Sequence, residues 1–214
     1  MLNPFLLMAA FYLVVAIVAV LDAVLTSFTL IPWFVGLPWL RVHFITLGVL
    51  TEAAFGVLPA FVADRRDAQA PATRWDIWLL LNSGLVVLLA GMPSVNTILI
   101  IAGGTLIFIA VTLLILHLRG IGGGQQSQGS GSLKFYLMGL VYLLVGIIVG
   151  TGLWVGWSEP LRIGVPKEVH IHANSWGFAS LVFAGLLVDL LPALTGRQLA
   201  SRRTVSAIFW AMAL

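Results

Sequence analysis

The chain has 214 residues, of which 60% are apolar and only 9% are charged, and its mean hydropathy is +1.07. In soluble domains about a quarter of all residues are charged, so this composition excludes an ordinary soluble fold. The absence of Cys excludes iron–sulfur clusters, disulfides, thiolate metal sites and covalent haem attachment through CxxCH. The net charge of +3 comes from few residues and indicates cytoplasmic loops, with no nucleic-acid partner.

Apolar stretches long enough to cross a bilayer, which takes about 20 residues, follow one another along the chain. A seventh apolar run begins after Arg203 and is either a truncated helix or a short terminal segment. We therefore expect an all-α, polytopic membrane helix bundle with 6–7 transmembrane helices in contact with the lipid bilayer. The six full stretches are residues 5–31, 38–62, 75–92, 95–118, 134–157 and 168–194.

The basic residues predict how the chain is oriented, because cytoplasmic loops are enriched in Lys and Arg. Connections 63–74, 118–134 and 195–203 hold most of them, and the alternate connections hold few. The N-terminus is therefore expected in the cytoplasm, in a multi-pass protein of the cell membrane. The helices at 38–62 and 168–194 then both enter from the outer face.

A Gly/Ser/Gln-rich linker at 120–132 divides the chain. We expect a first four-helix unit at 1–119 and a second, incomplete helical unit at 133–214. The two would form a tandem repeat of four-helix units, an arrangement known in membrane proteins.

The second helix of each unit contains the same motif. His43 and His172 are each followed by glycines five and thirteen residues later, so both segments read H-x4-G-x7-G. Two imidazoles at similar depth in two membrane helices suit a haem iron or another metal ion. The glycines allow close helix packing and leave room for a flat macrocycle. We therefore predict that His43 and His172 bind a cofactor as a pair.

The neighbouring polar residues have several interpretations. On a regular helix, His170 and His172 point about 200° apart, so both face one metal only if this turn is unwound. His172 matches the repeat and is taken as the primary ligand. His170 is a ligand of a second centre, a partner of a haem propionate, or an interfacial side chain. Arg41 is a snorkelling cation at the outer edge or the partner of a propionate.

Three acids lie inside predicted helices: Asp22, Glu52 and Asp189. Glu52 lies nine residues after His43 and is expected on the opposite helix face, protonated or part of a proton path. Asp189 is placed to cap its helix or to pair with Arg197. His117, near the cytoplasmic end of 95–118, is expected to be interfacial.

The segments RVHFITLGVLTEAAFGVLP and VHIHANSWGFASLVFAGLLVDLLP resemble the histidine-bearing helices of haem–copper oxidase subunit I and of its smaller, NnrS-type relatives. The resemblance implies four-helix units, a cytoplasmic N-terminus and haem ligands toward the outer side of each unit's second helix. By this resemblance His43 is the second-helix haem ligand, and His170 and His172 are similar to the paired histidines of the tenth helix. The adjacent His-His pair and the His-x3-Tyr pattern of the copper site are missing. The resemblance therefore implies one low-spin, b-type haem.

Three functions are compatible with these residues. The first is a haem-binding redox protein that exchanges electrons with quinol, an outer donor or another membrane subunit, or that responds to nitric oxide or oxygen. The second is a copper site made by His43, His170 and His172, as in membrane monooxygenases, since imidazole also suits copper. The third is a non-catalytic assembly or transport subunit, associated with other subunits or with copies of itself.

Overall fold

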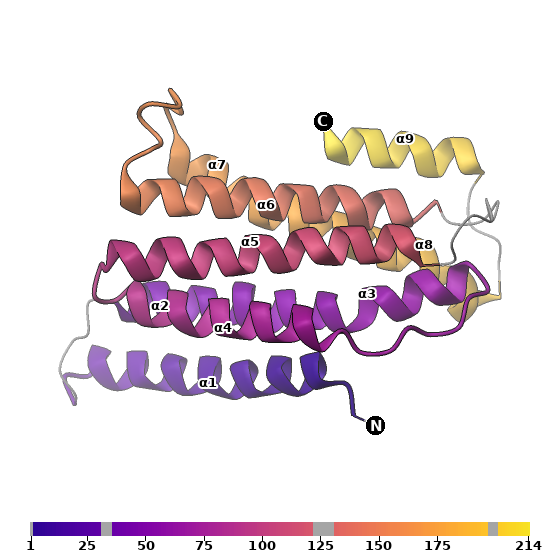
Figure 1. The fold of residues 1–214 in the computed structure, drawn as a ribbon. Helices are drawn as coiled ribbons and strands as arrows, with labels where there is room; N and C mark the ends of the chain where they lie inside the picture. The colour runs from indigo at the N-terminus through magenta and orange to yellow at the C-terminus, as the bar shows by residue number, and fades with distance from the viewer. Residues whose placement is uncertain (1, 31–35, 122–130, 197–200) are drawn as a thin grey trace. The chain divides into compact units, whose positions relative to one another are not determined.

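The structure is a computed structural model that describes residues 2–30, 36–121, 131–196 and 201–214. Over these residues the chain is helical and has no β-strand, which confirms the predicted all-α class (Figure 1). The helices are labelled α, and two π-helical segments are labelled η. Their order is α1 (Pro4–Ser27), α2 (Leu37–His43), η1 (Phe44–Thr51), α3 (Glu52–Arg65), α4 (Trp75–Gly91), α5 (Thr97–Gly120), α6 (Leu133–Val155), α7 (Pro166–His172), η2 (Ala173–Ser180), α8 (Leu181–Thr195) and α9 (Arg202–Ala213).

Five continuous helices are long and apolar enough to span a membrane, which confirms a multi-pass helical membrane protein. Helix α4 is apolar but has 17 residues, so it is about 25 Å long and lies at the lower limit for crossing a bilayer. The predicted seventh run forms α9, which has 12 residues. The five long spans are Pro4–Ser27, Pro38–Arg65, Thr97–Gly120, Leu133–Val155 and Pro166–Pro192.

The helix ends follow from local residue chemistry. The side chain of Asn3 accepts a hydrogen bond from the backbone N–H of Phe5 at 3.0 Å and caps α1. Proline occupies the first turn of α1, α2 and α7, where a missing N–H costs nothing. Helices α6 and α8 end at Gly156 and Gly196, whose φ angles of 82° and 64° favour glycine.

The described chain packs as two compact units. The first consists of Met1–Gly56 and Thr73–Ala110, and the second of Val57–Ala72 and Val111–Leu214. The border between them runs through α3 and α5. The predicted four-helix units, 1–119 and 133–214, are a division by sequence repeat and stay a prediction. Most of the predicted linker, residues 122–130, lies outside the described residues.

Glycines bring the helices of the first unit close together. A Cβ added to Gly84 of α4 would stand 2.8 Å from Cγ1 of Ile107 in α5. A Cβ added to Gly103 of α5 would stand 2.6 Å from the backbone nitrogen of Leu88 in α4. Small residues of this kind allow the backbones of neighbouring membrane helices to approach each other closely.

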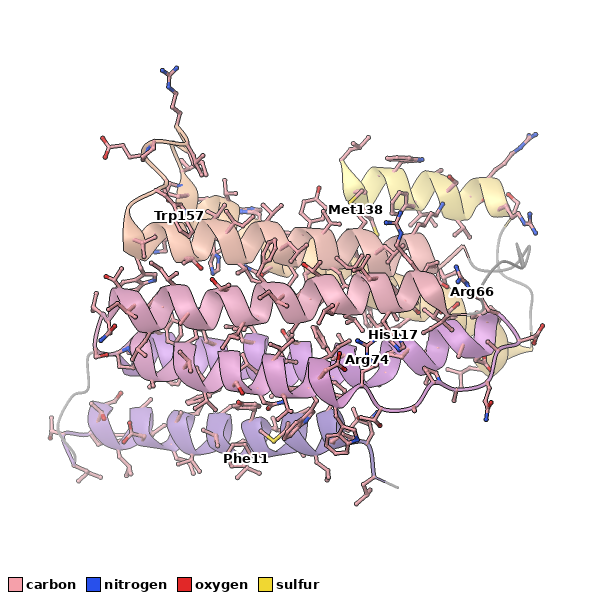
Figure 2. The ribbon with its side chains drawn as sticks, viewed as in Figure 1. Phe11, Arg66, Arg74, His117, Met138 and Trp157 are labelled. Carbon is pink, nitrogen blue, oxygen red and sulfur yellow. The ribbon has the colours of Figure 1, made fainter. Side chains whose placement is uncertain are left out.

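In the second unit α9 packs onto α6 and α8 through an apolar cluster of Phe135, Leu181, Phe209 and Ala213. The rings of Phe135 and Phe209 meet edge to face, with their centroids 5.1 Å apart. At the other end of α6, Trp157 donates its indole N–H to the carbonyl of Ile148 at 2.8 Å (Figure 2).

Candidate functional site

The two predicted haem ligands end the two short helices that precede the π-helical segments. His43 is the last residue of α2, before η1, and His172 is the last residue of α7, before η2. Each π-helical segment has eight residues. π-Helical turns are rare and occur frequently at functional sites. The repeated sequence motif is therefore a repeated structure as well.

Each histidine ring is held by a hydrogen bond to its own helix. Nδ1 of His43 lies 2.8 Å from the carbonyl oxygen of Trp39, and Nδ1 of His172 lies 2.8 Å from the carbonyl oxygen of Glu168. A carbonyl oxygen only accepts, so in each neutral ring Nδ1 carries the hydrogen and Nε2 carries the lone pair. Metal-binding histidines are commonly oriented in this way. Both rings therefore have the tautomer of an Nε2 ligand.

The π-helical segments also close in the same way. The hydroxyl of Thr51 donates to the carbonyl of Thr46 at 3.0 Å, and the hydroxyl of Ser180 donates to the carbonyl of Ser175 at 3.0 Å. Each bond reaches back five residues, which is also the spacing of the backbone hydrogen bonds in a π-helix. The matching hydroxyls occupy the last position of η1 and of η2.

The glycine five residues after each histidine packs under a tyrosine of the preceding long helix. A Cβ on Gly48 would stand 2.6 Å from Cγ of Tyr12 in α1, and a Cβ on Gly177 would stand 2.3 Å from Cγ of Tyr142 in α6. Real Cβ atoms do not approach this closely. Only glycine therefore lets these helices lie against the tyrosine rings.

The second glycine of each motif also meets a matching residue. A Cβ on Gly56 would stand 3.1 Å from Cβ of Phe5, and a Cβ on Gly185 would stand 3.1 Å from Cβ of Phe135. In each copy, the two glycines of the motif thus allow two successive close contacts with the preceding long helix, α1 or α6.

The repeat extends into the helices before the histidines, a part that the histidine-based prediction missed. Helices α1 and α6 both read F-x-L-M-x3-Y-L-x-V, starting at Phe5 and at Phe135. Tyr12 and Tyr142, which pack on the glycines, occupy the same position in the two copies of this motif. Met138, labelled in Figure 2, is the methionine of the second copy. The signal is readable in the sequence once the two helices are aligned 130 positions apart.

His170 has a different place from His172. Helix α7 is regular through both residues. Nδ1 of His170 lies 2.8 Å from the carbonyl oxygen of Gly146 in α6, and the Asn174 side chain bonds the His170 carbonyl at 2.8 Å. A Cβ on Gly150 would stand 2.5 Å from the His170 ring. His170 therefore joins α7 to α6, and the unwound turn that a shared copper site would need is not found.

The surroundings of the two repeat histidines differ. The His43 ring is half-buried and stacks on Trp39, with centroids 3.8 Å apart and planes at 14°. His172 is exposed, and Arg41 is half-buried two residues before His43. His43 belongs to the first unit and His172 to the second. Each is described within its own unit, so their pairing stays a prediction.

The titratable residues of the described structure form no cluster of metal-ligand type. Across the residues that the structure describes, no three His, Cys, Asp or Glu side chains gather as metal ligands would. His117 is half-buried near the end of α5 (Figure 2).

The two most buried acids have opposite surroundings. Asp189 is 4% exposed, lies 3.0 Å from Nε of Arg65 and accepts a hydrogen bond from the Tyr136 hydroxyl at 2.5 Å. Arg65 also donates to the Asp189 carbonyl. The predicted partner Arg197 lies outside the described residues. Glu52 is completely buried, and both of its carboxylate oxygens lack a hydrogen-bond partner in the described structure.

Comparison with protein-family models, with curated proteins and with solved structures finds no match to this chain. The resemblance of the two histidine-bearing segments to haem–copper oxidase subunit I therefore stays a prediction from the sequence.

Proposed function

We propose that this multi-pass membrane protein binds one b-type haem through His43 and His172 and works in electron transfer. The observation that carries the proposal is the matched setting of the two rings. Each ends a short helix, precedes a π-helical segment, and has Nδ1 bonded to a carbonyl oxygen at 2.8 Å. In both neutral rings the lone pair then lies on Nε2, the nitrogen that would bind a haem iron.

The residues fit the cofactor in their chemistry. A haem held by His43 and His172 would supply one-electron transfer, because both of its protein ligands would be imidazoles. The chain would hold the two ligands on rigid helices, with Trp39 against one face of His43. Arg41 is placed to pair with a propionate, because a guanidinium binds carboxylates with two hydrogen bonds.

The orientation and partners belong to the same proposal. With the N-terminus in the cytoplasm, as the basic loops indicate, both histidines lie toward the outer side of the cell membrane. Electrons would then come from an outer donor or from quinol, and would pass to another membrane subunit or a second copy of the chain.

The test is an optical spectrum of the purified full chain after reduction. A six-coordinate haem b gives sharp α and β bands, and extraction gives one haem per chain. His43→Ala and His172→Ala should each abolish the low-spin spectrum.

His170→Ala is the matched control, because it removes an imidazole from the same helix that carries His172. It should leave the haem spectrum intact, although α7 loses its contact with Gly146. A colourless wild-type protein, or a His172→Ala variant with an unchanged spectrum, would overturn the proposal.

A further inference from the structure

Glu52 is a buried carboxyl group inside a membrane-spanning helix. It is the first residue of α3, directly after η1, and has no exposed surface. Both of its oxygens lack a hydrogen-bond partner among the residues described. An ionised carboxylate is costly to bury in a protein interior or a membrane unless it is paired. The group therefore needs either a proton or a bound cation.

Polar groups on two neighbouring helices are unsatisfied beside it. Asn82 of α4 lies close to the Glu52 side chain, and its own Oδ1 is buried without a donor among the described residues. Tyr12 of α1 lies within electrostatic reach of Glu52, and its hydroxyl is buried without a partner. Three helices thus bring incomplete hydrogen-bonding groups to one place in the first unit.

Within the part of the chain that the structure describes, no positive side chain is found among the groups that act on Glu52. Tyr12 and Asn82 are the polar side chains that α1 and α4 bring to it, and both are neutral. The other acids of these helices lie further along them. Asp22 is about 15 Å beyond Tyr12 along α1, and Asp76 is about 9 Å before Asn82 along α4.

The second copy of the repeat shows that the fold does not require a carboxyl here. Leu181 lies 129 positions after Glu52, as His172 does after His43, and it is the first residue of α8. Leu181 is completely buried in the apolar cluster with Phe135. An apolar residue thus fills this position in one copy, whereas the other copy has a buried acid.

We propose that Glu52, Asn82 and Tyr12 form a proton-binding site inside the first unit, in which the Glu52 carboxyl carries one exchangeable proton. A protonated carboxyl has an O–H donor, and Asn82 Oδ1 is an acceptor that lacks one. A hard cation takes about six or more oxygen ligands, and these side chains offer only four oxygens. One proton therefore suits the site better than a metal ion and leaves the interior neutral.

Infrared spectroscopy of the full chain in lipid tests the protonation state. The spectrum of the wild type minus that of Glu52→Gln, at neutral pH, should show the carbonyl stretch of one protonated carboxylic acid. The band should shift in deuterium oxide and fall as the pH becomes alkaline. Glu52→Leu, which copies Leu181, should lose the same band and remain folded.

Asp189→Asn is the matched control, because Asp189 is buried but paired with Arg65. That variant should remove a carboxylate band and leave the acid band in place. Absence of an acid band from the Glu52 difference spectrum would overturn the proposal. So would a band that disappears when sodium chloride replaces choline chloride, since the site would then hold a cation. These readings do not depend on haem, so they can fail while the haem proposal stands.

Discussion

The pair α1 with η1 and the pair α6 with η2 are two versions of one arrangement. In each, a tyrosine ring packs on a glycine, a histidine bonds to its own helix, and a hydroxyl closes the π-helical segment. They differ at the polar atoms. The Tyr142 hydroxyl donates to the Ala213 carbonyl at 2.8 Å, whereas the Tyr12 hydroxyl is buried without a partner in the described structure. Leu181 in one pair corresponds to Glu52 in the other.

Comparing the two helix pairs distinguishes the residues that the packing requires from those that it does not require. The glycines and tyrosines present in both pairs are explained by packing, because they set the distance between helices. A buried polar group present in one pair only is not explained by packing. Unsatisfied groups of this kind cost stability, and they point to a role beyond the fold.

The largest expected effect tests the shared packing. Gly177→Ala places a Cβ 2.3 Å from Cγ and 2.5 Å from Cβ of Tyr142, so rotation of the ring does not relieve the clash. The helices must separate, at a cost at or above the upper end of the about 1–3 kcal/mol typical of overpacking. Gly48→Ala should behave alike, with its Cβ 2.6 Å from Tyr12. Thermal unfolding in detergent measures both.

Gly120→Ala is the control for that series, since no atom lies within 4 Å of its added Cβ. It should leave the stability unchanged or raise it slightly, because alanine restricts the unfolded chain. A Gly48 variant as stable as this control would show that the two pairs are not equivalent.

The fold was predictable from the sequence where the signal is local. Hydropathy placed the five long spans, because each needs only a run of apolar residues. The histidine motif was found for the same reason, as its residues lie within one helix. The Arg65–Asp189 ion pair was missed, since it joins residues 124 positions apart, and no sequence pattern marks such a pair.

The π-helical segments were not predictable, and they limit arguments from helical periodicity. The predicted direction of Glu52 relative to His43 counts 3.6 residues per turn across nine residues. Segment η1 lies between the two and has a wider turn, so that count does not apply there. Apolar residues suit α- and π-helices alike, and the extra residue per turn leaves no mark in composition.

The two buried acids give the second test of the comparison. Asp189→Asn leaves Arg65 without its anion and should cost about 2 kcal/mol, less than a fully buried pair because Arg65 is 32% exposed. Glu52→Gln replaces a carboxyl group that has no ion-pair partner in the described structure by an amide of the same shape, which can also donate to Asn82 Oδ1, and should cost much less. Unfolding of both variants under one set of conditions measures the difference. Equal losses would mean that Glu52, like Asp189, is stabilised by an opposite charge.

The smallest effect distinguishes the two tyrosines. Tyr142→Phe removes the hydrogen bond to the Ala213 carbonyl and should cost about 1 kcal/mol. Tyr12→Phe removes a buried hydroxyl that has no partner in the described structure, so it should cost less or be neutral. Both variants keep the ring that packs on glycine, so any difference in unfolding free energy comes from the hydroxyl. If Tyr12→Phe cost as much as Tyr142→Phe, the Tyr12 hydroxyl would be bonded in the folded protein. The Tyr12 hydroxyl would then be hydrogen-bonded in the first unit as the Tyr142 hydroxyl is in the second. It would no longer be an unsatisfied group near Glu52.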